Sequence, residues 1–565
     1  MDPSPGPQAE EGSLPANHRV SIPPWLAGPQ VTLFGPPDHA KMAINAMNAL
    51  HRKLADEPAL VAELVDGSGA VPRWGADSED SKTPITRDLL AASDNLAACF
   101  DRTLRVDEPS GKSYVLADHA LARPIKRVAG LALPDGSHLL EGEPLPLHLV
   151  ELVQHAASHA GRPEALCFYL PKLENEEEAA YIAALLSATE QRLGIDHGTI
   201  RVLLVFENPR AIFRIREMAE ALFPWFVGGS LGWHDFLAST ARLFKNDPGY
   251  RIPVKADPNI VIRHIRESHR ILVDQLSAIG ALKIGGMYGV LPTDGDDDSY
   301  TVSIVGFIKD VTTQLKRGLD GFWVAHPDFV RLGIALCEAW RRRAQDTASP
   351  DVDALVRAVV PDAEVAKLLA FVHADDAPGL APDDPRYARA VLAAELGEAS
   401  AIPNHHPDEV RYNVFQALQY LADWLGGRGC VALPATMKTA AGETVFVRVM
   451  DDLATTERSR WELWAEVHHG RVPLALFESI LAEEVNFIRE RRATPTKRTQ
   501  VPWDERWYPV AAALLRHLVV TGEPPEFGTE LLLPFAHAPV REAHDPLTMA
   551  RALCPGRYPN PAPSV

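Results

Sequence analysis

Two acidic residues close consecutive strand candidates of this 565-residue chain. Glu207 ends the run VLLVFE, and Asp235 ends FVGGSLGWHD 28 positions later, which is about the length of one strand-and-helix repeat of a β/α barrel. Because functional groups of such barrels gather where the strands end, we expect both carboxylates at one rim. Mg²⁺ prefers oxygen ligands and usually takes one or two carboxylates from a protein. The spacing is therefore typical of a magnesium site, and the alternative is that each acid only caps a helix or forms a salt bridge.

A second acidic cluster and one arginine extend this set. Asp77, Glu79 and Asp80 lie in GADSEDS, at the end of the strand candidate VPRWGAD. They are interpreted either as partners of metal-bound water or as a solvated turn. Arg127 stands within the apolar run PIKRVAGLAL. An enclosed guanidinium needs an anionic partner or a developing oxyanion, so this arginine is either part of a structural ion pair or a group that stabilises a reacting oxygen.

Asp452 adds a carboxylate at another strand end. It follows the strand candidate ETVFVRVMD and begins the polar stretch DLATTERSR. That position suits a functional group at the rim, and it suits a helix N-cap equally well. The histidines show no HExxH or comparable spacing, so the pattern does not indicate a zinc-protease type of site.

Alternating strand and helix patterns position these residues. Short apolar runs are separated by amphipathic stretches such as EEEAAYIAALLSATEQRL, and this alternation predicts parallel βαβ units. Seven or eight such units indicate a closed (β/α)8 barrel of the TIM type, followed by a C-terminal helical domain. The strand candidates are VPRWGAD, PIKRVAGLAL, LCFYL, TIRVLLVFE, FVGGS, LKIGGM and GFWVAH.

The pattern also predicts where the parts of the chain begin and end. Residues 1–28 are rich in Pro, Gly and Ser and are expected to form a flexible leader. The main part of the barrel is expected at 29–335, and a helical segment at 336–430 is expected to be inserted before the last barrel strand. Residues 431–452 are expected to hold an inserted hairpin and that last strand, with Asp452 at its end. The C-terminal helical domain is expected at 453–565.

Composition and charge exclude several classes of function. Lys and Arg number 56 against 75 Asp and Glu, and the formal net charge of −19 disfavours nucleic acid and anionic membranes as partners. The five cysteines are scattered and form no CxxC pair, which favours a reducing compartment. The chain starts without a signal-peptide pattern and has no long apolar window, so we expect a cytoplasmic protein. The sequence contains no signal for the oligomeric state.

Taken in order along the chain, these segments resemble the malate synthase family. FGPPDHAKMAINAMNAL resembles the segment ITGPxDRKMxINALNSGA of that family, and GADSEDSKTP resembles ADFEDSxxP. MDDLATTERSRWELWAEVHHG resembles MEDAATAEISRxQxWxWxHHG. The resemblance runs from about residue 30 to the stretch LLLPFAHAP at 531–539, and between these segments lie RVAGLALP, FYLPKLE, LGIDHGTIRVLLVFE, IGGM, GLDGFWVAHPD and WLGGRG.

The resemblance implies an acyltransferase that condenses acetyl-CoA with glyoxylate and hydrolyses malyl-CoA to malate and CoA, a step of the glyoxylate cycle. It implies Mg²⁺ as the cofactor, with Glu207 and Asp235 as ligands. Arg127 takes the position of the catalytic arginine of the family, and Asp452 takes that of the catalytic base. The other positions that match family segments are Glu79 and Asp80 near the metal, and Gly232, His234, Trp323 and Pro327 at the substrate and CoA pocket.

Some positions depart from the family pattern. Ala129 and Ala132 replace an arginine and a histidine beside Arg127, and Trp233 and His234 precede Asp235 where the family has Arg and Trp. An insertion at 434–448 precedes Asp452, and the N-terminal helical clasp of shorter family members is not expected. These departures leave open a related lyase or synthase that acts on malyl-CoA, another 2-oxo acid or another acyl-CoA. A non-catalytic binding protein on the same barrel is the third alternative.

Overall fold

A computed structural model describes residues 19–558 apart from residues 55, 255–257, 395–401 and 495. The predicted leader thus lies mostly outside the described residues. Its last part, residues 19–28, is not a flexible tail, because the side chain of Leu26 is fully buried and Val20, Ile22 and Trp25 pack against the same interior cluster. This short apolar segment covers the end of the barrel where the strands begin, and that burial accounts for its order.

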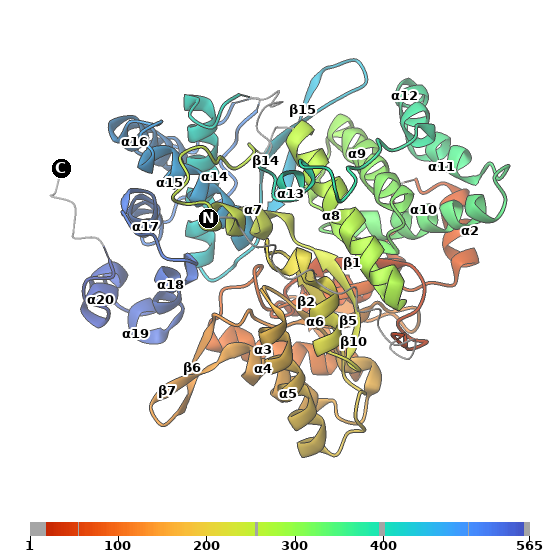
Figure 1. The fold of residues 1–565 in the computed structure, drawn as a ribbon, viewed down its shortest axis with the longest axis horizontal. Coiled ribbons are helices and arrows are strands. Elements are labelled where there is room, and N and C mark those ends of the chain that lie inside the picture. The colour runs from red at the N-terminus through yellow and green to blue at the C-terminus, as the bar shows by residue number, and fades with distance from the viewer. Residues whose placement is uncertain (1–18, 55, 255–257, 395–401, 495, 559–565) are drawn as a thin grey trace, which may run out of the picture.

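Eight parallel strands close into a barrel, as the alternation predicts (Figure 1). Seven of them coincide with strand candidates. The eighth is β1, at the start of the described fold, where QVTLFG pairs with both β2 and β13. The strands are β1 (Gln30–Gly35), β2 (Arg73–Asp77), β5 (Arg123–Arg127), β8 (Cys167–Leu170), β9 (Arg201–Phe206), β10 (Phe226–Leu231), β11 (Leu282–Tyr288) and β13 (Gly321–Val324).

Large side chains fill the barrel interior. Phe34 and Trp323 pack with ring centroids 4.2 Å apart, and Tyr169 lies 5.5 Å from Phe34. All three belong to one buried interior cluster. A filled interior confines ligand binding to the rims, so the chemistry of this chain must take place where the strands end.

Helices surround the barrel. Several carry standard start signals: the side chain of Asn175 caps α5, and that of Asp296 caps α9, each by accepting an N–H of the first turn. The helices used below are α5 (Glu176–Leu193), α7 (Trp233–Leu243), α8 (Pro258–Ile279), α9 (Asp297–Lys316) and α10 (Asp328–Gln345). None of the described helices is long and apolar enough to cross a membrane.

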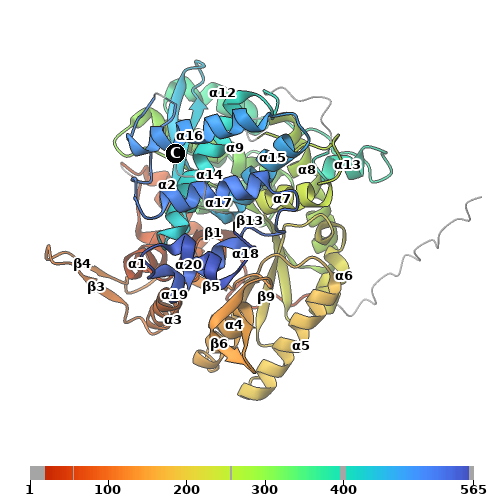
Figure 2. The same ribbon diagram turned by 90° about the vertical axis from the view of Figure 1, so that its left-hand side faces the viewer.

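The C-terminal part of the chain is helical, as predicted, and has a core of its own. Its main helices are α14 (Pro407–Leu425), α15 (Leu453–His468), α16 (Leu474–Arg489) and α17 (Tyr508–Val520). Figures 1 and 2 show these helices, in teal and blue, gathered on one side of the barrel. Helix α15 packs against α7, which follows β10, so the helical domain covers part of the rim where the barrel strands end.

The prediction that the last barrel strand lies within 431–452 is wrong. Residues 431–438 (β14) and 444–451 (β15) form an antiparallel hairpin that pairs with β12 (Val290–Leu291) in a separate three-stranded sheet. The barrel is already closed by β13 pairing with β1. The strand that completes the eight is β1, near the start of the described chain, which is not among the strand candidates. The helical segment after residue 335 therefore follows the barrel instead of interrupting it.

Candidate active site

The ends of four barrel strands bring predicted site residues together. Asp77 is the last residue of β2 and Arg127 the last of β5, while Glu207 directly follows β9. Asp235 lies in the first turn of α7 after β10. Since β2, β5, β8, β9 and β10 are adjacent in the barrel, these side chains share one rim, as the spacing predicts.

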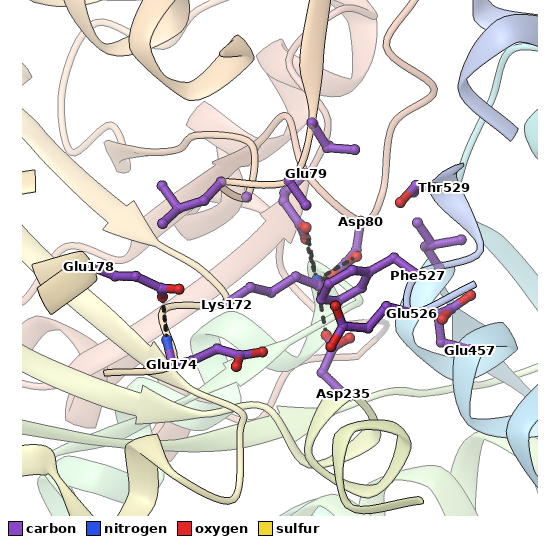
Figure 3. A pocket seen from close by; sticks show the side chains of 15 residues that line it. Glu79, Asp80, Lys172, Glu174, Glu178, Asp235, Glu457, Glu526, Phe527 and Thr529 are labelled. Carbon is purple, nitrogen blue, oxygen red and sulfur yellow. Dashed lines mark hydrogen bonds and ion pairs between the residues drawn. The ribbon is translucent and has the colours of Figure 1, made fainter. Parts of the chain in front are cut away.

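Lys172, which follows β8, lies at the centre of this rim (Figure 3). Its Nζ atom is 2.8 Å from Glu79 Oε1, 2.8 Å from Asp80 Oδ2 and 3.1 Å from Asp235 Oδ2. Its backbone N–H donates a 2.7 Å hydrogen bond to Glu207 Oε1. One residue thus contacts four of the predicted acidic site residues.

Sequence reasoning assigned no role to Lys172. The available signal was its position, one residue beyond the buried strand end CFYLP. Its backbone adopts φ of 58°, in the left-handed region that non-glycine residues seldom occupy. Such conformations concentrate at functional sites, where surrounding contacts hold them in place. In Lys172, the ion pairs of its side chain with Glu79, Asp80 and Asp235 and the hydrogen bond of its backbone N–H hold this conformation in place.

Arg127 forms a two-pronged ion pair with Asp77. Its Nε and Nη2 atoms donate to Asp77 Oδ1 and Oδ2 at 2.6 and 2.5 Å, and its Nη1 atom lies 3.6 Å from Asp80 Oδ2. The guanidinium stands 5.3 Å above the ring of Phe34. Burial acts to lower the pKa of Arg127, but Asp77 and the other carboxylates outweigh it and raise that pKa. The arginine is therefore a fixed positive charge at the rim.

Asp452 caps α15 and faces the same rim. Its Oδ1 atom accepts the N–H of Thr455 at 3.2 Å. Burial and the charge of Asp80 raise its pKa to about 7. The backbone holds it near Asp80, because the N–H of Leu453 donates to the Asp80 carbonyl oxygen at 3.3 Å, and the hydroxyl of the buried Tyr420 donates to the same oxygen at 3.1 Å. Both interpretations of Asp452, N-cap and functional carboxylate, thus fit the geometry.

Negative charge is in excess at this rim. Burial raises the pKa of Glu79 and of Asp235 well above their ordinary values, and it raises that of Glu207. Lys172 and Arg127 are the two cations in contact with these acids in the described part of the chain. The acidic side chains are Asp77, Glu79, Asp80, Glu207, Asp235 and Asp452.

The donor set fits Mg²⁺ in its chemistry. Carboxylate oxygens are the ligands that this ion prefers, and a divalent cation would offset the excess of buried negative charge. Over the residues that the structure describes, no three His, Cys, Asp or Glu side chains converge as a ready metal site. The ammonium group of Lys172 lies among the carboxylates, so metal binding requires these side chains to rearrange around it.

A cavity of about 190 Å³ opens over these residues. Its acidic side contains Glu79, Asp80 and Asp235 with Lys172, and its apolar side is formed by Leu131 and by Phe527 from the C-terminal domain. Ala132, which replaces the family histidine, also lines it. The cavity thus lies between the barrel rim and the helical domain.

The predicted substrate-pocket residues lie in different places. A Cβ atom on Gly232 would be 2.3 Å from Glu207 Oε2, so only glycine lets that carboxylate take its position. His234 packs against Trp233, with ring centroids 4.3 Å apart. Trp323 is buried in the barrel interior beneath Phe34, and Pro327 precedes α10. None of these four residues lines the cavity above Lys172.

Comparison with known proteins identifies the family of this chain. The family model "Malate synthase, TIM barrel domain" matches residues 124–352, and "Malate synthase, C-terminal" matches residues 404–529. The chain belongs to the malate synthase family. It is 27% identical over 479 residues to malate synthase A of Escherichia coli, covering 83% of this chain and 76% of that protein. It is 28% identical over 487 residues to the malate synthase of Streptomyces clavuligerus, covering 83% and 77%.

The two family matches contain most of the candidate site residues. The barrel match contains Arg127, Lys172, Glu207 and Asp235, and the C-terminal match contains Asp452. These five residues thus come from two parts of the sequence that each match the family, whereas Asp77, Glu79 and Asp80 precede both matches.

Replacing Lys172 by Met is expected to destabilise the protein by about 3–5 kcal/mol at neutral pH, because it leaves buried carboxylates without their cation. Glu79 and Asp235 have raised pKa values, so their destabilising effect appears as the pH rises above their unfolded pKa values. The loss should accordingly be smaller at pH 5 than at pH 8 in urea unfolding. A pH-independent loss would contradict this role of Lys172.

Proposed function

We propose that this chain condenses acetyl-CoA with glyoxylate and hydrolyses the resulting malyl-CoA to malate and CoA. The observation that carries the proposal is the shared rim, where Asp452, with a pKa of about 7, lies near Arg127 and a carboxylate cluster. A carboxylate with that pKa is suited to take a proton near neutral pH. Membership of the malate synthase family supports the same reaction.

Mg²⁺ is proposed as the cofactor, held by Glu207 and Asp235. The excess of negative charge and the oxygen donors support this assignment. When bound, Mg²⁺ polarises the aldehyde oxygen of glyoxylate as a Lewis acid. Glu79 and Asp80 are proposed to contact metal-bound water, and Lys172 limits the repulsion between the carboxylates.

The reacting groups of the protein are proposed to be Asp452 and Arg127. Asp452 takes a proton from the methyl group of acetyl-CoA, and the guanidinium of Arg127 stabilises the enolate oxygen that forms. The enolate carbon then attacks the aldehyde carbon of glyoxylate, and water cleaves the thioester. Because Arg127 is held by Asp77 through two hydrogen bonds, it needs no reorganisation when charge develops.

The reaction is tested by supplying acetyl-CoA, glyoxylate and Mg²⁺ and measuring free thiol together with malate. We expect thiol and malate to appear in equal amounts, without lasting malyl-CoA. Accumulation of malyl-CoA without thiol would contradict the proposal and would identify a lyase. A series of 2-oxo acids in the same assay reports how strictly glyoxylate is selected.

The pH dependence of kcat/KM should follow Asp452. Its carboxylate acts as a base only when deprotonated, so activity is expected to rise with pH and to reach half its maximum at a pH of about 7. Because the charge of Asp80 contributes to that raised pKa, Asp80→Asn should move the acidic limb to lower pH. A profile of kcat/KM that is flat from pH 5.5 to 8.5 in the unaltered enzyme would contradict the assignment.

Replacing Glu207 by Gln is expected to weaken Mg²⁺ binding at least about 10-fold, because an amide is a poorer ligand than a carboxylate and lacks its charge. Calorimetric titration with Mg²⁺ measures this directly, without turnover. Glu190→Gln is the matched control, since Glu190 is also buried but accepts the backbone N–H groups of Gly198 and Ile200. Equal Mg²⁺ affinities of the two variants would exclude Glu207 as a ligand.

A further inference from the structure

A loop of the C-terminal domain covers part of the cavity above Lys172. The loop follows α17 and consists of residues 521–528, and its residues Glu526 and Phe527 line the cavity. Figure 3 shows the ring of Phe527 pointing from the C-terminal domain toward Lys172. A gap of about 10 Å³, room for about one water molecule, has Phe527 and Asp235 on its walls. The ring therefore lies close to the proposed metal ligand.

Helix α15 anchors the backbone of this loop. Glu457 Oε1 accepts the N–H of Gly528 at 3.0 Å. Arg460 Nη2 donates to the Glu526 carbonyl oxygen at 2.9 Å and to Glu457 Oε2 at 2.7 Å. Glu457 is 6% and Arg460 0% exposed, so water competes little for these bonds. A Cβ atom on Gly528 would lie 2.3 Å from Glu457 Oε1, so only glycine permits this contact. The backbone on both sides of Phe527 is thus tied to α15.

Arg242 of α7 holds the same loop through its side chains. Its Nη1 atom lies 3.1 Å from Glu526 Oε1, and its Nη2 atom donates to Glu174 Oε1. Its guanidinium stands 5.0 Å from the centre of the Phe527 ring, within the range of a cation–π contact. Asp235 lies two turns earlier on α7. Arg242 thus connects the ring of Phe527 to the helix that carries Asp235.

The apolar wall that includes Phe527, Leu131 and Leu453 determines which part of a substrate can face it. A 2-oxo acid turns the substituent on its carbonyl carbon toward such a wall, because its oxygen atoms would lack partners there. In glyoxylate this substituent is hydrogen. A cavity of about 150 Å³ accommodates benzene. The cavity of about 190 Å³ therefore has room for glyoxylate with Mg²⁺ and its water, and for little more.

We propose that Phe527 limits the size of the 2-oxo acid that binds beside Asp235, and that Arg242 is a positioning residue that holds the ring in place. The inference rests on the proposed function, because it concerns the substrate of that reaction. A ring tied to both α15 and α7 does not give way to a methyl group on the carbonyl carbon. One methylene group in an apolar pocket changes selectivity by about 10- to 200-fold, so glyoxylate is preferred over pyruvate.

Replacing Phe527 by Ala removes the ring and should raise the ratio of kcat/KM for pyruvate to that for glyoxylate about 10-fold or more. Thiol release measures both values, since acetyl-CoA, pyruvate and water give 2-methylmalate and CoA. Phe527→Leu, a milder change, should raise the ratio less. Phe244→Ala is the matched control, because Phe244 stacks on Tyr250 and does not line the cavity. An unchanged ratio in both Phe527 variants, or an equal rise in the control, would overturn the size limit.

A double-mutant cycle tests whether Arg242 acts through Phe527. Arg242→Met should raise the pyruvate ratio, and adding it to Phe527→Ala should change nothing further, because the ring that it positions is gone. Arg242→Lys keeps a cation and should give an intermediate ratio. Arg516→Met is the control, since Arg516 pairs with Glu478 and neither residue lines the cavity. Independent, additive effects of the Arg242 and Phe527 substitutions would overturn the positioning role.

Hydrogen exchange and binding keep these tests separate from the proposed reaction. The backbone N–H groups of residues 521–528 should exchange faster in Arg242→Met than in the unaltered protein, and equal exchange would overturn the positioning role. If the unaltered protein releases no thiol with glyoxylate, the proposed function fails, and calorimetry with Mg²⁺ then compares the affinities of the two acids. A gain of pyruvate affinity in Phe527→Ala would support the size limit, whereas an unchanged affinity would refute it.

Discussion

Replacing Asp452 by Asn is expected to lower kcat by about 10²- to 10⁴-fold, the usual contribution of a general base. The amide cannot accept the proton of the acetyl methyl group, whereas it can still accept the N–H of Thr455 and cap α15, because Asn and Asp cap helices about equally well. The structure of the site should therefore be retained. Steady-state kinetics with acetyl-CoA and glyoxylate measures the loss.

Asp296→Asn is the matched control for this substitution. Asp296 caps α9 by accepting the N–H of Ser299 at 2.9 Å, which is the same local role that Asp452 has at α15. The control variant should keep wild-type kcat. Calorimetry should show that Asp452→Asn still binds Mg²⁺ and glyoxylate. Wild-type turnover in the Asp452 variant would leave that residue with its capping role alone.

The second large effect is expected for Arg127→Lys, with a loss of about 10²- to 10³-fold in kcat, comparable to the removal of one oxyanion donor. Lysine keeps the charge, but its ammonium group cannot donate to both oxygens of Asp77 and also face the reacting oxygen. The enolate should therefore be poorly stabilised, while KM for glyoxylate should change less than kcat. The separation of kcat from KM distinguishes this effect from weakened binding.

Arg331→Lys controls for the loss of a buried two-pronged ion pair. Arg331 donates to both oxygens of Glu57 at 2.7 and 2.6 Å and is 6% exposed, yet it does not line the cavity above Lys172. Its substitution should lower stability and leave kcat unchanged. Equal losses of kcat in the two variants would show that Arg127 acts only through folding.

Lys172 changes how the carboxylate cluster is understood. The sequence predicts acids around a metal, whereas the structure places an ammonium group in contact with Glu79, Asp80 and Asp235. Acids this close and this buried would repel one another strongly without a cation. Lys172 supplies that cation through its ion pairs with these three carboxylates.

Several features of this protein were determined by its sequence alone. Seven strand candidates, separated by amphipathic stretches, predict the barrel, because the hydrophobic period reports local structure. The end of each barrel strand is also a local signal, so the positions of Glu207, Asp235 and Arg127 at one rim were predictable. Asp452 follows β15, a strand of a separate sheet, so its place at that rim did not follow from its position at a strand end. The family segments are local strings as well, and the comparisons confirm the family.

Only the tertiary structure decided which of these residues contact one another. β1 was missed because it is a short apolar run beside a Pro-rich stretch, and its role as the closing strand depends on pairing with β13, about 290 residues away. The burial of Trp323 beneath Phe34 and the contact of Lys172 with four acids likewise depend on distant segments. Charge, spacing and hydrophobic period indicate the chemistry and the local structure of each residue. Contacts between segments that are distant in the sequence determine which groups its side chain lies against.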